Sequence, residues 1–160
     1  MDLSIVLVSW NTRELLKKCL DTVEDELNLQ ATIKAEIFVV DNGSTDGSQA
    51  MMRAEFPGVQ LIENSINVGF GAANNQAMRQ AQGRFVLLLN SDTEVHPNAL
   101  SSLIDVLETR PDLGAVGPLL LNSDGTLQRS CDPEPTLTRE LWRLFHLDKL
   151  VHYGIYNHNN

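Results

Sequence analysis

Residues 37–46 read Ile-Phe-Val-Val-Asp-Asn-Gly-Ser-Thr-Asp, an apolar run that passes directly into small polar and acidic side chains. The same change occurs at Ser9–Asn11 after Ile5–Val8, and at Asn90–Asp92 after Phe85–Leu89. Short apolar runs bounded by turn residues are typical of strands buried on both faces. Stretches with helical periodicity separate them. The pattern therefore predicts an α/β fold with a mostly parallel, Rossmann-like sheet flanked by helices.

The polar residues at the strand ends are expected to lie together. In open α/β sheets, ligands bind beyond the carboxyl ends of the strands. These clusters would therefore share one crevice, which offers carboxylates, amides, hydroxyls and glycines but almost no lysine or arginine. That mixture favours a site for a nucleotide and a metal ion.

Charge narrows the choice of ligands. The net charge of −9 and the pI near 4.7 argue against nucleic acid and anionic lipid as partners. An acidic protein that binds a diphosphate needs compensating positive charge, and the sequence has no Walker motif with its phosphate-binding lysine. A divalent cation held by carboxylates would supply that charge, and hard oxygen ligands suit Mg²⁺ or Mn²⁺.

The 160 residues suit an α/β domain at 1–130, followed by a helical extension at 131–160. No stretch approaches the roughly 20 apolar residues of a membrane helix. The chain begins directly with a strand, so we expect a cytoplasmic protein, with a peripheral position at the inner face of the membrane as a further expectation. Cys19 and Cys131 show no metal-binding spacing, and Cys19 is predicted to be an inert thiol in the core.

Helix boundaries follow from capping residues and glycines. Asn11 is predicted to cap a helix over 12–27, with Glu14 completing a box-like pair. A later helix is predicted to run to about Gln82, with Gly83 in its C′ position.

Two further strands are predicted in the second half of the chain. Arg84–Leu89 is the most apolar run and is predicted to be the central strand. Gly114–Leu121 is predicted as a strand that enters a tight turn at Asp124-Gly125.

Three acidic residues are candidates for ligand binding. Asp41 lies at a strand end, where its carboxylate can accept a hydrogen bond from a base N–H, although turn chemistry alone also places Asp there. Asp46 suits helix capping and ligand binding equally. Asp92 follows a run of leucines, and a cation bridging it to a diphosphate would relieve the cost of burying its charge; the alternative is a turn residue.

Other candidates carry weaker signals. Asn67 and Gly69 lie in a glycine-rich stretch that suits either a phosphate loop or close packing of helix on strand. Asn74 and Asn75 are poor helix formers, so one of them is expected to bond to another group. Trp10 suits stacking on a base or packing.

The ordered stretches Ser4–Asn11, Val39–Ser48, Asn67–Asn75 and Leu88–Asp92 together closely resemble the nucleotide-sugar-binding half of glycosyltransferase family 2, which has the GT-A fold. Within that family the rhamnosyltransferase-like members are the most similar. The likeness covers roughly residues 3–145, and Arg129 with the stretch 135–137 is a looser match to a fifth motif. Arg129 suits contact with the diphosphate or an acceptor and a solvated surface position equally.

The resemblance implies roles for individual residues. Those expected to bind the nucleotide sugar are Ser9, Trp10, Asn11, Asp41, Asn67, Gly69, Asn75, Asn90, Ser91 and Asp92. Within this set, Ser9–Asn11 and Asp41 would hold the nucleobase. Asn90-Ser91-Asp92 stands in the place of the family's Asp-X-Asp motif. Its first residue is Asn, so Asn90 would contact ribose or a metal-bound water, and Asp92 would carry Mg²⁺ or Mn²⁺.

The resemblance further implies an inverting glycosyltransferase that moves a sugar from a dTDP- or UDP-sugar, dTDP-rhamnose included, to a polysaccharide or glycolipid. The family's catalytic base has no counterpart here, and Asp124 has a turn context that disfavours it. We therefore expect the donor-binding portion of a longer, apparently truncated enzyme. Its 137–151 helix would pair as a homodimer or pack on a missing part. The alternatives are a non-catalytic nucleotide-binding module and a flavodoxin-like FMN binder, which would need a hydroxyl-rich phosphate loop after the first strand.

Overall fold

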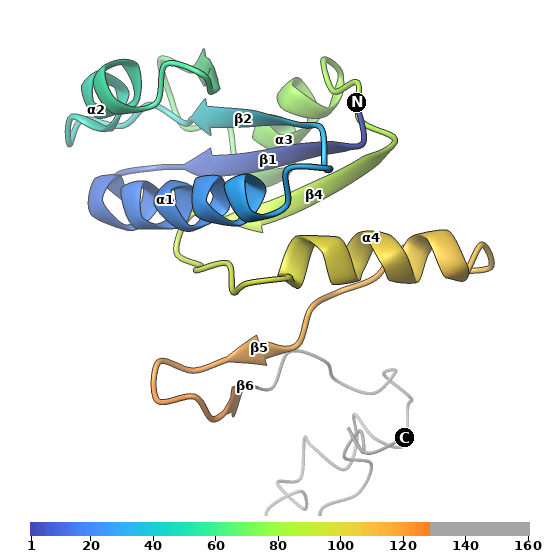
Figure 1. Cartoon of the computed structure of the whole chain (residues 1–160). Coiled ribbons are helices and arrows are strands. Elements are labelled where there is room, and N and C mark those ends of the chain that lie inside the picture. Colours follow the sequence, from blue (N-terminus) through green and yellow to red (C-terminus); the bar gives the residue numbers. More distant parts are fainter. Residues whose placement is uncertain (129–160) are drawn as a thin grey trace, which may run out of the picture. The chain divides into compact units, whose positions relative to one another are not determined.

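The computed structural model describes residues 1–128, in which parallel strands alternate with helices (Figure 1). The elements are, in chain order, β1 (Leu3–Ser9), α1 (Arg13–Leu29), β2 (Ala35–Asp41), α2 (Ser48–Glu55), β3 (Gln60–Glu63), α3 (Phe70–Met78), β4 (Phe85–Asn90), α4 (Ala99–Thr109), β5 (Leu120–Leu121) and β6 (Leu127–Gln128). The chain divides after Val116 into two units. The predicted boundary near residue 130 remains a prediction.

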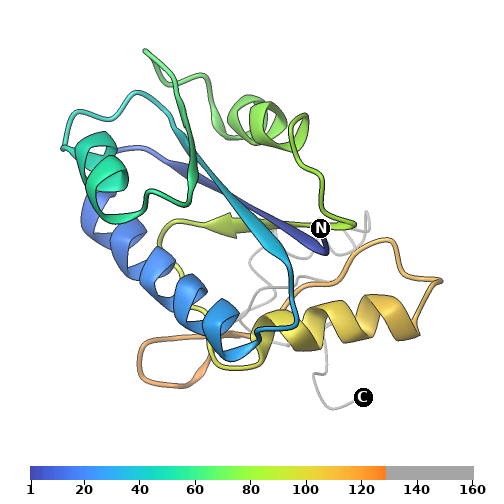
Figure 2. The same ribbon diagram turned by 45° about the horizontal axis from the view of Figure 1, so that its top comes forward.

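The first unit is built on a four-stranded parallel sheet in the order β3-β2-β1-β4. Helices cover both faces, with α1 and α2 on one side and α3 on the other (Figure 2). Side chains alternate along β1, so Ile5 and Leu7 join the core under α1, while Val6 joins the core under α3. On the α3 side, Ala73 and Ala77 are fully buried, and their small side chains allow the helix to approach the sheet closely. The predicted α/β architecture is confirmed.

The prediction that β4 is the central strand is wrong. Within residues 1–128, β4 pairs only with β1 and forms an edge of the sheet. Its alternate residues Val86 and Leu88 are 44% and 47% exposed, whereas β1 is buried on both faces apart from half-buried Val8. A short apolar run has the same composition in either position. Within residues 1–128 the interior strands are β1 and β2, not β4.

Gly83 has a different role from the predicted one. Helix α3 ends at Met78, well before Gly83. Gly83 instead lies against β1, where an added Cβ would clash with the Ser4 backbone nitrogen. Its own N–H donates to Ser4 Oγ at 2.8 Å. Glycine is therefore needed at position 83, because its backbone lies too close to the backbone of β1 to leave room for a side chain.

The second unit contains, within the described residues, an antiparallel hairpin of β5 and β6 that pairs Leu120 with Gln128. The predicted turn at Asp124-Gly125 is confirmed, and Gly125 has a φ of 80°. Only the last two residues of the predicted strand 114–121 form β structure. Arg129, Cys131 and the predicted 137–151 helix lie outside the described residues. No helix in the described part of the chain has the length and apolarity needed to span a bilayer.

Candidate functional site

Strand register brings the predicted polar clusters to one edge of the sheet. Ser9 at the end of β1 is level with Asp41 at the end of β2, and Val8 is level with Asn90 at the end of β4. Because these strands are parallel, the segments that follow them leave the sheet at the same end. The structure therefore confirms that the carboxyl ends of these strands lie together at one end of the sheet, which we call its carboxyl edge.

Asp41 is the most enclosed of the candidate residues. Its side chain is buried, and its Oδ2 accepts hydrogen bonds from Ser44 N at 3.0 Å and from Gln49 Nε2 at 2.7 Å. Its Oδ1 is shielded from solvent and has no hydrogen-bond partner among residues 1–128. A buried acceptor without a donor costs about 1–3 kcal/mol. Asp41 is thus a fixed carboxylate with one oxygen left to satisfy.

Asn11 ties the β1–α1 loop to the β2–α2 loop. It has a left-handed φ of 54°, its N–H donates to Ser44 Oγ at 2.9 Å, and its Oδ1 accepts from Thr45 N at 2.8 Å. The prediction that Asn11 caps α1 is wrong, since Thr12 occupies the N-cap position, and the Thr12 side chain accepts no hydrogen bond from the first turn of the helix. The amide that would have capped the helix is committed to the neighbouring loop.

Asp46 joins the first turns of two helices. Its Oδ2 accepts from Arg13 N at the start of α1 at 2.9 Å, and its Oδ1 accepts from Ser48 N at the start of α2 at 3.0 Å. Burial would raise the pKa of this carboxyl, but hydrogen bonds from Ser48 and Arg13 outweigh it and lower the pKa. Of the two predicted roles, capping is the one with observed contacts, and it serves both helices.

Asn67 and Gly69 shape the entry to α3. Asn67 Oδ1 accepts from Gly69 N at 2.9 Å and from Asn42 Nδ2 at 2.9 Å. Asn42 is buried and also accepts from Val68 N at 3.1 Å. Gly69 has φ 86° and ψ 157°, a conformation that is essentially restricted to glycine. This loop is therefore held beside the Asp41 loop.

The remaining predicted nucleotide contacts differ in exposure. Trp10 is 55% exposed, so its ring is available to a ligand and is not a packing residue within the described part of the chain. Asn75 is exposed on α3, whereas Asn74 is buried and donates to Phe70 O at 2.9 Å. The expectation that one of these two asparagines bonds to another group is met by Asn74, inside its own helix.

A line of hydroxyls connects the ends of β1 and β4. Thr12 Oγ1 lies 2.9 Å from Ser9 Oγ and 3.1 Å from Ser91 Oγ. Ser9 and Ser91 are both buried. Two segments that are 79 residues apart in the sequence are thereby fixed to one another next to Asp92.

Asp92 itself is exposed, as is Asn90. No group of three or more His, Cys, Asp or Glu side chains in residues 1–128 could enclose a metal ion. The donor set instead fits an ion such as Mg²⁺, which commonly uses one or two carboxylates together with substrate phosphates and water. Asp92 would be the carboxylate, and the remaining ligands would come from a bound diphosphate and solvent.

Sequence reasoning missed four residues that organise this edge: Thr12, Asn42, Ser44 and Gln49. Each lies one to eight residues beyond a strand end, where a polar residue is expected in any loop. Their specific role depends on contacts between loops that are distant in sequence. Only their position after β1 or β2 could have signalled them.

Comparison with known proteins places this arrangement in a family. Residues 4–154 match the model of Glycosyl transferase family 2. The chain is 28% identical over 148 residues to N-acetylglucosaminyl-diphospho-decaprenol L-rhamnosyltransferase of Mycobacterium tuberculosis, an alignment that covers 86% of this chain and 47% of the relative.

Solved structures share the fold. TarS 1–349 of S. aureus, in complex with UDP-GlcNAc, has a TM-score of 0.59 and 22% identity over 69% of this chain and 32% of its own. The mannosyltransferase PcManGT of Pyrobaculum calidifontis, in complex with GDP-Man and Mn²⁺, has a TM-score of 0.58 and 24% identity over 66% of this chain and 32% of its own. This chain thus spans about half of the mycobacterial relative and a third of these structures. It has the GT-A fold and belongs to glycosyl transferase family 2.

Proposed function

We propose that the carboxyl edge of the sheet binds a nucleoside-diphosphate sugar whose base is uracil or thymine. The observation that carries this proposal is the free Oδ1 of Asp41, a buried carboxylate oxygen without a donor among the described residues. The N3–H of uracil or thymine is a donor that matches a single carboxylate oxygen. Folding has already removed this oxygen from solvent, so a hydrogen bond from a ligand N–H would recover much of the free energy that its desolvation costs.

The neighbouring residues complete a base site in this proposal. Exposed Trp10 offers a ring face for stacking, and Asn11 fixes the loop that carries it. Ser9 bonds to Thr12 in the line of hydroxyls between β1 and β4. Asn67, Gly69 and Asn75 contact the nucleotide sugar from the loop before α3 and from its first turns. The complex of TarS with UDP-GlcNAc supports a nucleotide sugar as the type of ligand.

Asp92 is proposed to bind Mg²⁺ or Mn²⁺ on the diphosphate side, with Asn90 directed to ribose or to a water on the ion. The ion would neutralise charge on the departing diphosphate. The chain needs such compensation, because its net charge is −9. The Mn²⁺ in the PcManGT complex supports a divalent ion in this fold. Ser91, tied to Thr12, would keep the Asp92 loop in place.

The reaction we propose is inverting transfer of a hexosyl or deoxyhexosyl group. The name of the mycobacterial relative supports rhamnose as the sugar, and dTDP-rhamnose is the donor that we propose for it. The acceptor would be a polysaccharide or glycolipid at the cytoplasmic face of the membrane. Residues 1–130 would form the donor-binding domain, and 131–160 would lead into the acceptor-binding part. A base outside the assigned residues would take the proton of the acceptor hydroxyl.

Calorimetric titration with UDP, dTDP, ADP and GDP, each with Mn²⁺, tests the base assignment. We expect the two pyrimidine diphosphates to bind at least tenfold more tightly than the purines. Guanine pairs with a carboxylate through two donors, N1–H and N2–H₂, whereas Oδ2 of Asp41 is already engaged, and adenine has no ring N–H on its pairing edge. Equal or tighter binding of ADP or GDP would refute the assignment.

A transfer assay separates an enzyme from a non-catalytic nucleotide-binding module. The 160-residue chain is supplied with dTDP- and UDP-linked sugars and varied acceptors, and transfer is compared with donor hydrolysis. We expect donor binding without transfer, because no residue in the described part has been assigned as the base. Transfer above hydrolysis would place the base within the chain, and Asp124 would be the first residue to substitute.

A further inference from the structure

Glu26 is a buried carboxylate that the proposed function does not use. It lies on the buried face of α1, following Cys19 and Val23 in an otherwise apolar stripe. Its Oε2 accepts a hydrogen bond from Asn98 N at 2.9 Å. Its Oε1 is shielded and has no partner among residues 1–128. One half of this carboxylate therefore fastens α1 to the start of α4, and the other half is unsatisfied.

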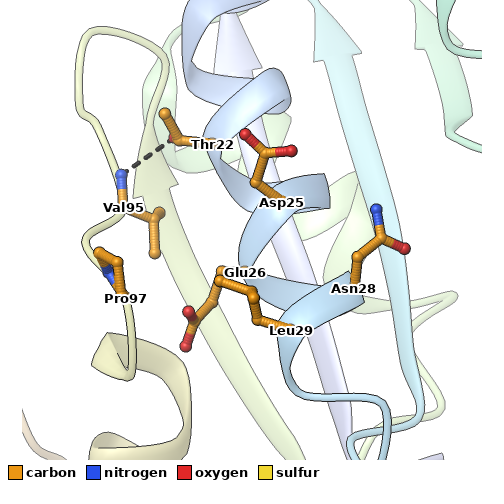
Figure 3. A pocket seen from close by; sticks show the side chains of 7 residues that line it. All are labelled: Thr22, Asp25, Glu26, Asn28, Leu29, Val95 and Pro97. Atoms are coloured by element: carbon orange, nitrogen blue, oxygen red, sulfur yellow. Dashed lines mark hydrogen bonds between the residues drawn. The ribbon is translucent and has the colours of Figure 1, made fainter.

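The carboxylate borders a hollow of about 480 Å³ between the second half of α1 and the segment that precedes α4 (Figure 3). Figure 3 shows the Glu26 side chain pointing away from α1 toward that segment. The lining residues are Thr22, Asp25, Glu26, Asn28, Leu29, Val95 and Pro97. None belongs to the proposed nucleotide site, so the hollow is a separate feature of the molecule.

Local charge makes the hollow negative. Asp25 lines it together with Glu26, and the last turn of α1 carries no basic residue. The carboxyl end of a helix has a partial negative charge, so these carboxylates add to the dipole of α1 and do not offset it. In the described part of the chain, the cations on α1 pair with carboxylates other than Asp25 and Glu26. Among residues 1–128, no basic side chain lines the hollow.

We propose that this hollow binds an alkylammonium group, with the ammonium on Glu26 Oε1 and the alkyl stem along Leu29, Val95 and Pro97. A single free oxygen suits an ammonium, which bonds as a point charge. A guanidinium fork prefers both oxygens of a carboxylate, and Oε2 is already engaged. A dehydrated metal ion would need more anionic ligands than this site provides.

Access requires a movement of Glu26, because Oε1 is shielded from solvent in the ligand-free conformation. The terminal torsion of a glutamate is broad, so the proposal includes a rotation of this carboxyl that turns Oε1 toward the hollow. The amides of Val95 and Asn98 both bond to α1 and so report on binding.

The test is an NMR titration of the ¹⁵N-labelled 160-residue chain with n-butylammonium, with neutral n-butanol as the comparison ligand. We expect saturable shifts at the Val95 and Asn98 amides with the cation and at least tenfold weaker binding of the alcohol. Glu26→Gln should raise the Kd for n-butylammonium at least tenfold, because it removes the negative charge from the site. Its amide oxygen can still accept from Asn98 N, so the link between α1 and α4 is kept. Glu24→Gln, which removes an exposed charge from the same helix, should change the Kd less than twofold.

Two outcomes would overturn the proposal: no saturable shift at Val95 and Asn98, or equal binding of the cation and the alcohol. Both are measured on the unsubstituted chain, so they decide the question even if Glu26→Gln does not fold. Putrescine and Nα-acetyl-lysinamide then distinguish the source of the amine. Tighter binding of putrescine supports a free amine as the occupant, and tighter binding of the lysine derivative supports a lysine side chain of a protein partner.

Discussion

The two carboxylates of the proposed nucleotide site, Asp41 and Asp92, differ strongly in burial and in the number of their hydrogen bonds. Asp41 is 1% exposed and accepts hydrogen bonds from Ser44 in its own loop and from Gln49 in α2. Asp92 is exposed, and the hydroxyl line through neighbouring Ser91 joins its segment to the end of β1. One carboxylate is fixed before any ligand arrives, and the other faces solvent.

This difference indicates how the binding free energy would be divided. A fixed acceptor loses little conformational entropy when a base binds, so the Asp41 side would select the ligand. An exposed carboxylate is weakly committed until an ion and a diphosphate bring it further partners. The Asp92 side would therefore contribute affinity that depends on the metal and little to the stability of the fold.

The largest effect is expected from Asp41→Asn. The amide oxygen can keep the bonds from Ser44 and Gln49, while the NH₂ replaces the free oxygen with a donor that opposes the N3–H. Affinity for UDP should fall roughly 10- to 150-fold, which corresponds to about 1.5–3 kcal/mol. Calorimetry measures the affinity and thermal unfolding checks the fold. Asp105→Asn, at an exposed carboxylate on α4, is the control and should leave affinity unchanged. An unchanged Kd in Asp41→Asn would contradict the assignment.

Gly43→Ala should destabilise the Asp41 side next most strongly. Gly43 has a φ of 81°, and an added Cβ would lie 3.1 Å from the backbone of Ile66. We expect a loss of about 1–3 kcal/mol in the free energy of unfolding, measured with denaturant. Gly47→Ala is the matched control. Its φ is 87°, but its nearest neighbour is the end of the Arg13 side chain at 3.9 Å, so its loss should be smaller. Equal losses would show that the contact with Ile66 adds nothing.

Asp46 should make the link between α1 and α2 sensitive to acid. Folding lowers the pKa of this carboxyl, so the unfolded chain binds its proton at higher pH than the folded chain does. The stabilisation is present above the unfolded pKa of about 3.9 and is lost as pH falls through the lower folded pKa. At pH 7, Asp46→Asn should cost about 1 kcal/mol, as for other lost helix caps. Denaturant unfolding should show the gap between wild type and variant closing toward pH 3, and a constant gap would argue against this role.

The smallest effect is expected from Thr12→Val, which removes the hydroxyl between Ser9 and Ser91 and keeps the shape. The loss of two neutral hydroxyl contacts should weaken UDP–Mn²⁺ binding about two- to fivefold. Thr12→Ser keeps the hydroxyl and should bind like wild type. If both variants bind equally to wild type, the hydroxyl line does not position the Asp92 segment.

The sequence was sufficient for features that depend on local pattern. Apolar runs such as Ile37–Val40, followed by turn residues, identify parallel strands and the edge at which their loops meet, because burial and turn chemistry act over a few residues. They do not reveal the order of strands. The run at Phe85–Leu89 is as apolar as a central strand, yet β4 lies at an edge in the described part of the chain.

Contacts between loops that are far apart in the sequence could not be predicted, because the sequence patterns describe only neighbouring residues. Asn11 is a residue type that commonly caps helices, but its side-chain oxygen accepts a hydrogen bond from the backbone N–H of Thr45, 34 residues away. Gly83 is a residue type that commonly follows a helix end, but here a side chain at position 83 would collide with the backbone of β1. Asp41 was found because a carboxylate at a strand end can accept a hydrogen bond from a base N–H, whereas Thr12 resembles any polar residue after a strand.

The most direct measurement is calorimetric titration of UDP into wild type, Asp92→Asn and Asp41→Asn, each with Mn²⁺ and with EDTA. Mn²⁺ should raise the affinity of wild type and of Asp41→Asn by the same factor, because the base and metal contacts are separate. The affinity of Asp92→Asn should not respond to Mn²⁺ and should equal that of wild type in EDTA. A full response of Asp92→Asn to Mn²⁺ would contradict the division of the site into a fixed base side and a metal-dependent side.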